Sequence, residues 1–183
     1  MKLSRANIPD LVICEPKKLK DERGFFCESF RKDSLENLLG YSLNFCQENF
    51  SESKYGVLRG LHFQIEPNAQ SKLVSVVKGR ILDVAVDIRK NSKFYGQSFS
   101  IELDDKTNKQ LFIPKGFAHG FVVLSKTARV SYKVDNYYNP KSERGLNYND
   151  PLLEIDWKID KKSIITNEKD NNYSSFDSEF FFE

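Results

Sequence analysis

The sequence has few of the residues that carry metal, disulfide or charge-driven chemistry. Only three of its 183 residues are cysteine and only two are histidine. Cys14, Cys27 and Cys46 are odd in number and lack the spacing of a metal site, which argues against a disulfide framework and a structural zinc. With 28 basic and 26 acidic residues, the net charge of +2 gives no electrostatic case for nucleic acid or an anionic membrane as a partner.

Long apolar runs and nucleotide fingerprints are missing as well. No signal-peptide pattern and no membrane-spanning run occurs in the sequence, so we expect a cytoplasmic protein. The sequence has no Gly-rich phosphate loop, no dinucleotide fingerprint and no serine nucleophile elbow, and nothing in it indicates a redox cofactor. The length suits one domain, which we expect to cover residues 1–183.

Most of the chain has the pattern of an all-β domain. From Phe45 onward, short segments alternate apolar and polar residues between turns, as in a barrel or sandwich. The one substantial helix expected before the carboxyl end follows Asp33, which forms a capping-box pair with Glu36, and Gly40 ends it. The aromatic end, Phe180–Phe182, is expected to pack against the barrel or a partner subunit, because an exposed aromatic triplet invites aggregation.

The two histidines, His62 and His119, each lie in a compact apolar stretch. A histidine between apolar neighbours is more often a core residue bonded to a backbone carbonyl. Arg59 favours a functional site, because a guanidinium buried beside an imidazole requires an anionic partner. A regular strand would send Arg59 and His62 to opposite faces, so we expect a bulge at Gly60 to turn both toward one cavity.

A β cavity that contains histidine, lysine and tyrosine has the groups for proton abstraction next to a carbonyl. The imidazole removes the proton, an ammonium such as Lys72 stabilises the enolate oxygen, and a tyrosine on the opposite side returns a proton. The period of two places Tyr132 on the same strand face as Val130 and Val134, so its ring is expected to point inward.

A metal-binding barrel is the competing interpretation of the same residues. His62-Phe63-Gln64 lacks the His-x-His pair that small metal-binding barrels commonly supply, and the cysteines are not clustered. We therefore expect no metal and no other cofactor.

Several short motifs follow one another at consistent spacing over most of the chain: Arg23–Phe26, Gln47–Asn49, Arg59–Gln64, Gln70–Val74, Asp83–Arg89, Ile113–Phe121, Asp150-Pro151 and Ile155–Trp157. Together they resemble the dTDP-4-dehydrorhamnose 3,5-epimerase family, whose members are cupin-type enzymes. Near the carboxyl end, Asn167-Glu168-Lys169-Asp170 is similar to the family's Ser-Glu-Lys-Asp. Residues 171–175 depart from the usual proline-containing continuation.

The resemblance implies a mainly β cupin-type double-stranded β-helix, or jelly-roll barrel, with a few short helices. It also implies a homodimer that needs no cofactor and acts on a dTDP-linked 4-keto-6-deoxyhexose. The family's catalytic positions match His62 as the base, Asp170 as its carboxylate partner, Lys72 at the keto oxygen and Tyr132 as the acid. Its substrate-binding positions match Arg23, Phe26, Glu28, Gln47, Asn49, Arg59, His119 and Tyr138. The Arg23 segment is implied to cross to the other subunit, and the diphosphate to be the anion that the guanidiniums require.

The expected reaction is inversion of the 3- and 5-positions of dTDP-4-keto-6-deoxyglucose, giving dTDP-4-keto-L-rhamnose for surface polysaccharide synthesis such as lipopolysaccharide. Residue identities do not define the cavity shape that selects one or two carbons. Two alternatives therefore stay open: a single-site 3- or 5-epimerase on a related nucleotide-linked ketosugar, and a non-catalytic or metal-dependent cupin. If Asp170 is not the partner of His62, Asp83 is the next carboxylate to consider.

Overall fold

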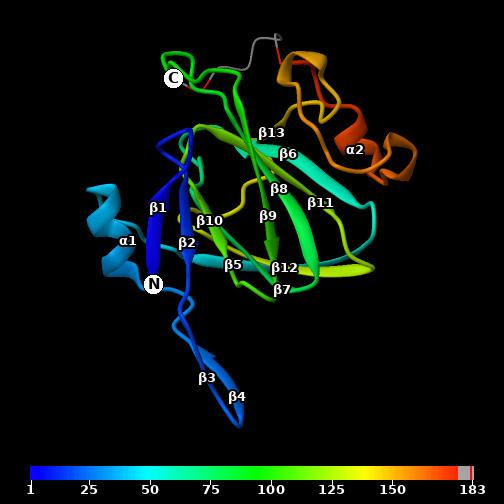
Figure 1. Ribbon diagram of the computed structural model, residues 1–183. Helices are drawn as coiled ribbons and strands as arrows, with labels where there is room; N and C mark the ends of the chain where they lie inside the picture. The colour runs from blue at the N-terminus through cyan, green and yellow to red at the C-terminus, as the bar shows by residue number, and fades with distance from the viewer. Residues whose placement is uncertain (177–181, 183) are drawn as a thin grey trace.

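The computed structural model describes residues 1–176 and 182, and antiparallel strands dominate it (Figure 1). The strands are β1 (Lys2–Arg5), β2 (Val12–Glu15), β3 (Lys18–Asp21), β4 (Gly24–Cys27), β5 (Gln47–Lys54), β6 (Leu58–Gln64), β7 (Lys72–Lys78), β8 (Arg80–Asp87), β9 (Ser98–Asp104), β10 (Gln110–Ile113), β11 (Phe117–Val123), β12 (Thr127–Val134) and β13 (Glu143–Gly145). The helices are α1 (Lys32–Leu39), η1 (Pro151–Leu153), η2 (Lys161–Ser163) and α2 (Glu168–Asn171).

Two sheets form the walls of a barrel. One sheet has the order β1-β2-β10-β7-β12-β5 and the other has the order β13-β6-β11-β8-β9. Apolar side chains from both sheets, among them Val74, Val130, Ala85 and Phe121, pack together between them. This architecture confirms the expected cupin-type jelly-roll fold.

Strand β8 is buried along almost its whole length because both of its faces are covered. On one face Ala85 packs in the barrel interior, and on the other Val84 packs with Trp157 and the segment after β13. The period of two puts Asp83 on the same face as Ala85. A carboxylate is therefore placed inside the barrel, where it requires a partner.

Helix α1 covers the outer face of the six-stranded sheet, with Leu35 buried against it. The expected capping box is wrong, because the N-cap residue is Arg31 and Asp33 lies in the first turn. The side chain of Glu36 instead accepts hydrogen bonds from the loop that follows the helix. Gly40 ends the helix in the left-handed conformation, as expected.

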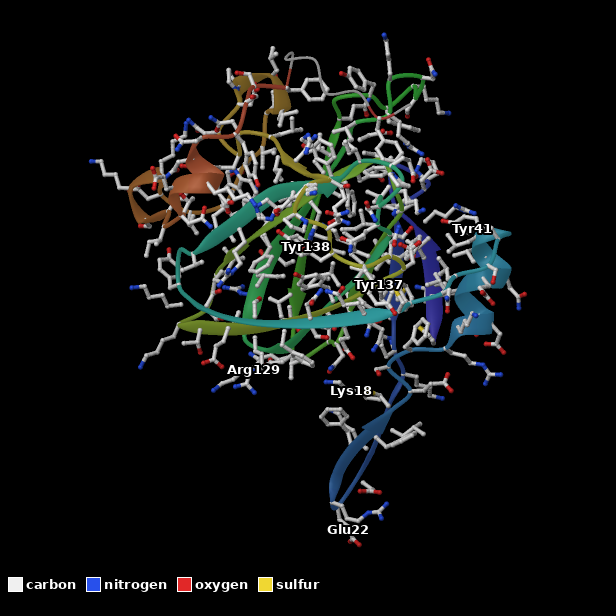
Figure 2. The ribbon with its side chains drawn as sticks, turned by 180° about the vertical axis from the view of Figure 1, so that it is seen from behind. Lys18, Glu22, Tyr41, Arg129, Tyr137 and Tyr138 are labelled. Carbon is white, nitrogen blue, oxygen red and sulfur yellow. The ribbon has the colours of Figure 1, made fainter. Side chains whose placement is uncertain are left out.

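The residues before α1 form four strands. Strands β1 and β2 join the six-stranded sheet, while β3 and β4 pair with each other as a separate hairpin. Figure 1 shows this hairpin projecting away from the barrel. Its tip includes Glu22, which lies well away from Tyr138 on the barrel in Figure 2.

The carboxyl-terminal segment returns to the barrel. Helix α2 lies beside β6, and Phe182 packs against the outer face of the five-stranded sheet, where its amide donates to the carbonyl of Ile88. Packing of the aromatic end against the barrel is thus confirmed for Phe182, whereas residues 180 and 181 lie outside the described part of the chain. Within residues 1–176 and 182, no helix is both long and apolar enough to cross a bilayer.

Candidate active site

A cavity of about 400 Å³ lies in the barrel, a size that suits a small-molecule ligand. Both sheets contribute to its wall, β6 and β11 from one and β5, β7 and β12 from the other. The lining residues are Gln47, Asn49, Ser51, Arg59, His62, Phe63, Gln64, Gln70, Lys72, His119, Phe121, Tyr132, Tyr138 and Glu143. The cavity therefore brings together most of the residues expected at the site.

A bulge in β6 allows Arg59 and His62 to line the same cavity. His62 pairs with His119 and Arg59 pairs with Phe121, so three steps along β6 match two along β11. Gly60 and Leu61 together therefore lie opposite the single residue Gly120. Gly60 has a φ of 140°, which residues with a side chain rarely adopt. The bulge expected at Gly60 is thus confirmed.

His62 forms a pair with Asp170. Its Nε2 atom lies 2.8 Å from Oδ1 of Asp170, and Oδ2 of the same carboxylate accepts a hydrogen bond from the amide of Gly60 at 3.1 Å. Asp170 is only 1% exposed, and the side chain of Asn167 caps α2 by accepting from the Asp170 amide. Since Nε2 faces the carboxylate, Nδ1 is the ring nitrogen left to take a proton from a ligand.

The surroundings of Asp170 keep it ionised. Burial raises the pKa of this carboxyl, but the hydrogen bond and charge of His62, together with the Gly60 amide, outweigh burial and hold the pKa below its ordinary value. An ionised carboxylate fixes the imidazole tautomer and stabilises the imidazolium that forms on proton capture.

Lys72 extends from β7 toward His62. Its side chain is buried, and Nζ donates to the backbone carbonyl of His62 at 3.3 Å. Burial lowers the pKa of Lys72 to about 8, although the negative charges of Asp83 and Glu143 oppose the shift. The amine is therefore still mostly protonated at neutral pH, and it brings a positive charge into a site shielded from water.

His119 forms a second pair, with Asp83. Nε2 of His119 lies 2.8 Å from Oδ1 of Asp83, and both side chains are buried. Burial lowers the pKa of His119, although Asp83 opposes the shift. The other oxygen of Asp83 has no hydrogen-bond partner among the described residues. Asp83 is thus occupied with His119, and the carboxylate beside His62 is Asp170 rather than the alternative Asp83.

Tyr132 comes from β12, in the sheet opposite that of His62. Its ring packs against the interior cluster and lines the cavity, which confirms the orientation expected from the period of two. Burial raises the pKa of Tyr132, and Arg59 partly opposes the shift. The phenol is therefore protonated at neutral pH and able to donate.

Arg59 differs from expectation in one respect. The residue is exposed rather than buried, and Nε donates to the hydroxyl of Ser53 at 3.1 Å. The expectation that Arg59 is buried is therefore wrong. Arg59 still borders the cavity, where its positive charge is available to an anionic ligand.

Polar groups surround Tyr138, and one of them, Glu143, was not expected at the site. The Tyr138 hydroxyl donates to Oε2 of Glu143 at 2.7 Å, and the same oxygen pairs with the ammonium of Lys169. The Tyr138 amide donates to Gln47, whose side chain donates in turn to Asn49. Glu143 begins the short strand β13, in a stretch of sequence rich in turn residues and without a periodic pattern, so no sequence signal distinguishes it as a lining residue.

The remaining predicted site residues lie on or beside the hairpin and do not line the cavity of their own chain. Arg23 is paired with Asp21 near the tip, and its side chain is 85% exposed. Phe26 is 69% exposed, and Glu28 lies 3.9 Å from Arg31. A role for these three residues across a subunit boundary stays a prediction.

The donor set does not resemble a metal centre. Among the described residues, no group of three or more histidine, cysteine, aspartate or glutamate side chains is arranged to hold a metal ion. The two histidines are each paired with a different aspartate instead.

Comparison with known proteins identifies the family. The family model described as dTDP-4-dehydrorhamnose 3,5-epimerase matches residues 5–178. The chain is 45% identical to the dTDP-4-dehydrorhamnose 3,5-epimerase of Shigella flexneri over 182 residues, which is 99% of each chain. The crystal structure of the enzyme of that name from Elizabethkingia anophelis, 49% identical, covers 96% of each chain with a TM-score of 0.93. A dTDP-6-deoxy-D-glucose-3,5-epimerase from Legionella pneumophila, crystallised with dTDP-4-keto-L-rhamnose, is 46% identical over 97% of this chain and 93% of that chain, with a TM-score of 0.92. The chain therefore belongs to the dTDP-4-dehydrorhamnose 3,5-epimerase family and is an isomerase.

Proposed function

We propose that the chain is a cofactor-independent epimerase that inverts the 3- and 5-positions of dTDP-4-keto-6-deoxyglucose, giving dTDP-4-keto-L-rhamnose for surface polysaccharide synthesis. The observation that carries the proposal is the pair of His62 and Asp170, which borders a cavity that also holds Lys72 and Tyr132. The complex of the Legionella relative with dTDP-4-keto-L-rhamnose supports the choice of ligand. In this proposal residues 1–183 act as one cupin-type domain.

The first step is removal of a proton from a carbon next to the ketone. Nδ1 of His62 takes the proton, and Asp170 stabilises the resulting imidazolium. The electron pair of the broken C–H bond moves into the carbon–carbon bond, and negative charge develops on the 4-keto oxygen. The ammonium of Lys72 stabilises that oxygen, and the effect is strong because the side chain is shielded from water.

The second step returns a proton on the opposite face of the sugar. Tyr132 belongs to the sheet opposite that of His62, so its phenol approaches the enolate from the other side. Donation from Tyr132 inverts the carbon, after which the phenolate regains a proton and His62 releases one. The sugar loses one proton and gains one, and both side chains return to their starting protonation states, as an isomerisation requires. Inversion of both carbons requires the sugar to present its 3- and 5-positions to the same two groups in turn.

The nucleotide end is proposed to bind on the side of Arg59 and Tyr138. Arg59 supplies an exposed guanidinium for the diphosphate, and the half-exposed ring of Tyr138 offers a flat surface for thymine. Gln47 and Asn49 contribute polar groups to the same wall. His119, fixed by Asp83, is proposed to contact a hydroxyl of the sugar.

A homodimer would complete the site. The hairpin presents three exposed apolar side chains, Leu19, Phe25 and Phe26, beside Arg23, a combination that is unfavourable in water and suited to a protein surface. We place Arg23, Phe26 and Glu28 at the cavity of the partner subunit. Mixing the Arg23→Ala protein with the His62→Ala protein should then restore activity, because a dimer of one subunit of each contains one site with both residues intact. Arg23→Ala alone is the control, and the absence of any recovery would contradict the exchange.

The decisive experiment incubates the protein with dTDP-4-keto-6-deoxyglucose in deuterated water, reduces the ketone chemically and locates deuterium by NMR. Label at both positions with the rhamno configuration is the expected result, and His62→Ala should abolish it. Label at one position alone would select a single-site epimerase. Binding of thymidine diphosphate without any label, or a stoichiometric metal whose removal abolishes activity, would contradict the proposal.

A further inference from the structure

Tyr173 lies against the proposed base, although it is part of none of the motifs discussed above. Its ring centroid is 5.7 Å from that of His62, and the two ring planes meet at 70°. This distance and angle are those of an edge-to-face aromatic contact. Tyr173 is in the segment 171–175, which directly follows Asp170, the partner of His62.

The backbone around Tyr173 holds its ring in place. Ser174 forms a parallel bridge with Leu146, and the amide of Asn147 donates to the carbonyl of Ser174 at 3.0 Å. Gly145, which pairs with His62 between β13 and β6, leaves the space that the ring fills. A Cβ atom at Gly145 would lie only 2.4 Å from the Tyr173 ring. The ring thus packs directly over the backbone opposite His62.

One hydrogen bond does not fully orient an imidazole. The bond between Nε2 of His62 and Asp170 fixes one ring atom, but the ring can still swing about the line that joins these two groups. Swinging would move Nδ1 relative to the sugar carbon, and proton transfer is sensitive to misplacement of about 1 Å. A second contact on the ring removes this freedom.

We propose that Tyr173 is a positioning residue that holds the His62 ring, together with Asp170, so that Nδ1 stays aligned with the carbon from which it removes a proton. This inference rests on the proposed role of His62 as the base. The ring of Tyr173 performs the positioning, because the ring is what meets the imidazole.

The hydroxyl of Tyr173 is not required for this role. Its oxygen is buried and makes no hydrogen bond of ordinary geometry among the described residues, although the ammonium of Lys169 acts on it. Burial raises the pKa of Tyr173, Glu143 adds to the shift and Lys169 opposes it, so the phenol stays neutral. Replacement by phenylalanine removes only this hydroxyl and keeps the ring that contacts His62.

The test compares three variants of the full-length protein. Tyr173→Ala is expected to lower kcat about tenfold with KM changed less than about threefold, and Tyr173→Phe to stay within about twofold of the original in both. Tyr95→Ala is the matched control, because Tyr95 packs against Phe176 of the same terminal segment at 4.8 Å. It should keep kcat within about twofold, since it loosens the segment without removing the ring from His62.

A second readout follows the imidazole itself. The chain has two histidines, so the ¹⁵N spectrum of labelled protein holds two imidazoles, and His119→Asn assigns them. We expect Tyr173→Ala to change the signals of His62 and leave those of His119 in place. Unchanged kcat in Tyr173→Ala, an equal loss in Tyr173→Phe or in Tyr95→Ala, or a loss confined to KM would each overturn the inference. Persistent deuterium incorporation in His62→Ala would instead refute the proposed function itself.

Discussion

Nε2 of His62 lies 2.8 Å from Oδ1 of Asp170, a residue 108 positions further along the chain. The carboxylate is buried and also accepts from the amide of Gly60, so it is held by the same strand that carries the histidine. This arrangement makes the position of His62, the proposed base, depend on the carboxyl-terminal segment. The reactivity of the site is therefore coupled to the docking of that segment against β6.

Asp170→Asn should slow the reaction without unfolding the protein. The amide keeps the size of the carboxylate but removes its charge, so the imidazolium formed on proton capture loses its partner. We expect kcat to fall at least about 100-fold, measured as deuterium exchange into the sugar. Asp160→Asn, at an exposed N-cap, is the control. An unchanged rate in Asp170→Asn would remove this residue from the mechanism.

Tyr132→Phe should separate proton removal from inversion. The phenol is protonated at neutral pH because burial raises its pKa, and its replacement leaves His62 and Lys72 intact. Exchange by His62 should persist, whereas formation of the inverted sugar should fall about 100-fold. NMR of the reduced product measures both quantities in one sample. Equal loss of the two would contradict the division of roles between the opposite sheets.

The rate should fall at alkaline pH as Lys72 loses its proton. Burial lowers the pKa of Lys72 to about 8, and only the ammonium stabilises the enolate oxygen. We expect kcat/KM to decline above pH of about 8, and Lys72→Met to lose at least about 100-fold in rate together with this limb of the profile. If kcat/KM of the Lys72→Met variant still declined in the same pH range, the decline would belong to another titrating group.

Burial of Lys72 should lower the free energy of unfolding at neutral pH. Between pH of about 8 and the unfolded-state value of 10.5, the unfolded chain binds more protons than the folded one, so the free energy of unfolding rises with pH across this range. Below it, burial of the ammonium costs roughly 3 kcal/mol. We expect Lys72→Met to be more stable than the original at pH 7 by about 2 kcal/mol, measured by urea unfolding, and to lack the alkaline rise.

Gly60→Ala should destabilise the bulge that aligns Arg59 with His62. Gly60 has a φ of 140°, and a Cβ there would lie 2.5 Å from Cα of Gly120. We expect a loss of about 3 kcal/mol in the free energy of unfolding. Gly24→Ala is a matched control, because its φ of 127° is similar but nothing lies within 4 Å of its Cβ. A loss as small as that of the control would mean that the close approach of β6 and β11 is easily relieved.

The sequence by itself determined the features that depend on neighbouring residues. Alternation along the strands predicted the inward face of Tyr132, and glycine predicted the bulge at position 60 and the end of the helix at position 40. These features follow from backbone sterics and the period of the strand, which act within a few residues. The motifs also placed His62 and Lys72 at one site, because family resemblance carries order and spacing.

Only the tertiary structure decided which side chains meet. The pairing of His62 with Asp170 and of His119 with Asp83 brings together residues far apart in the chain, and no local pattern assigns one carboxylate to one histidine. Tyr173 reaches His62 only because the carboxyl-terminal segment packs beside β13. Closure of the barrel sets these contacts, since it fixes the distance between strands and segments that sequence periodicity leaves independent.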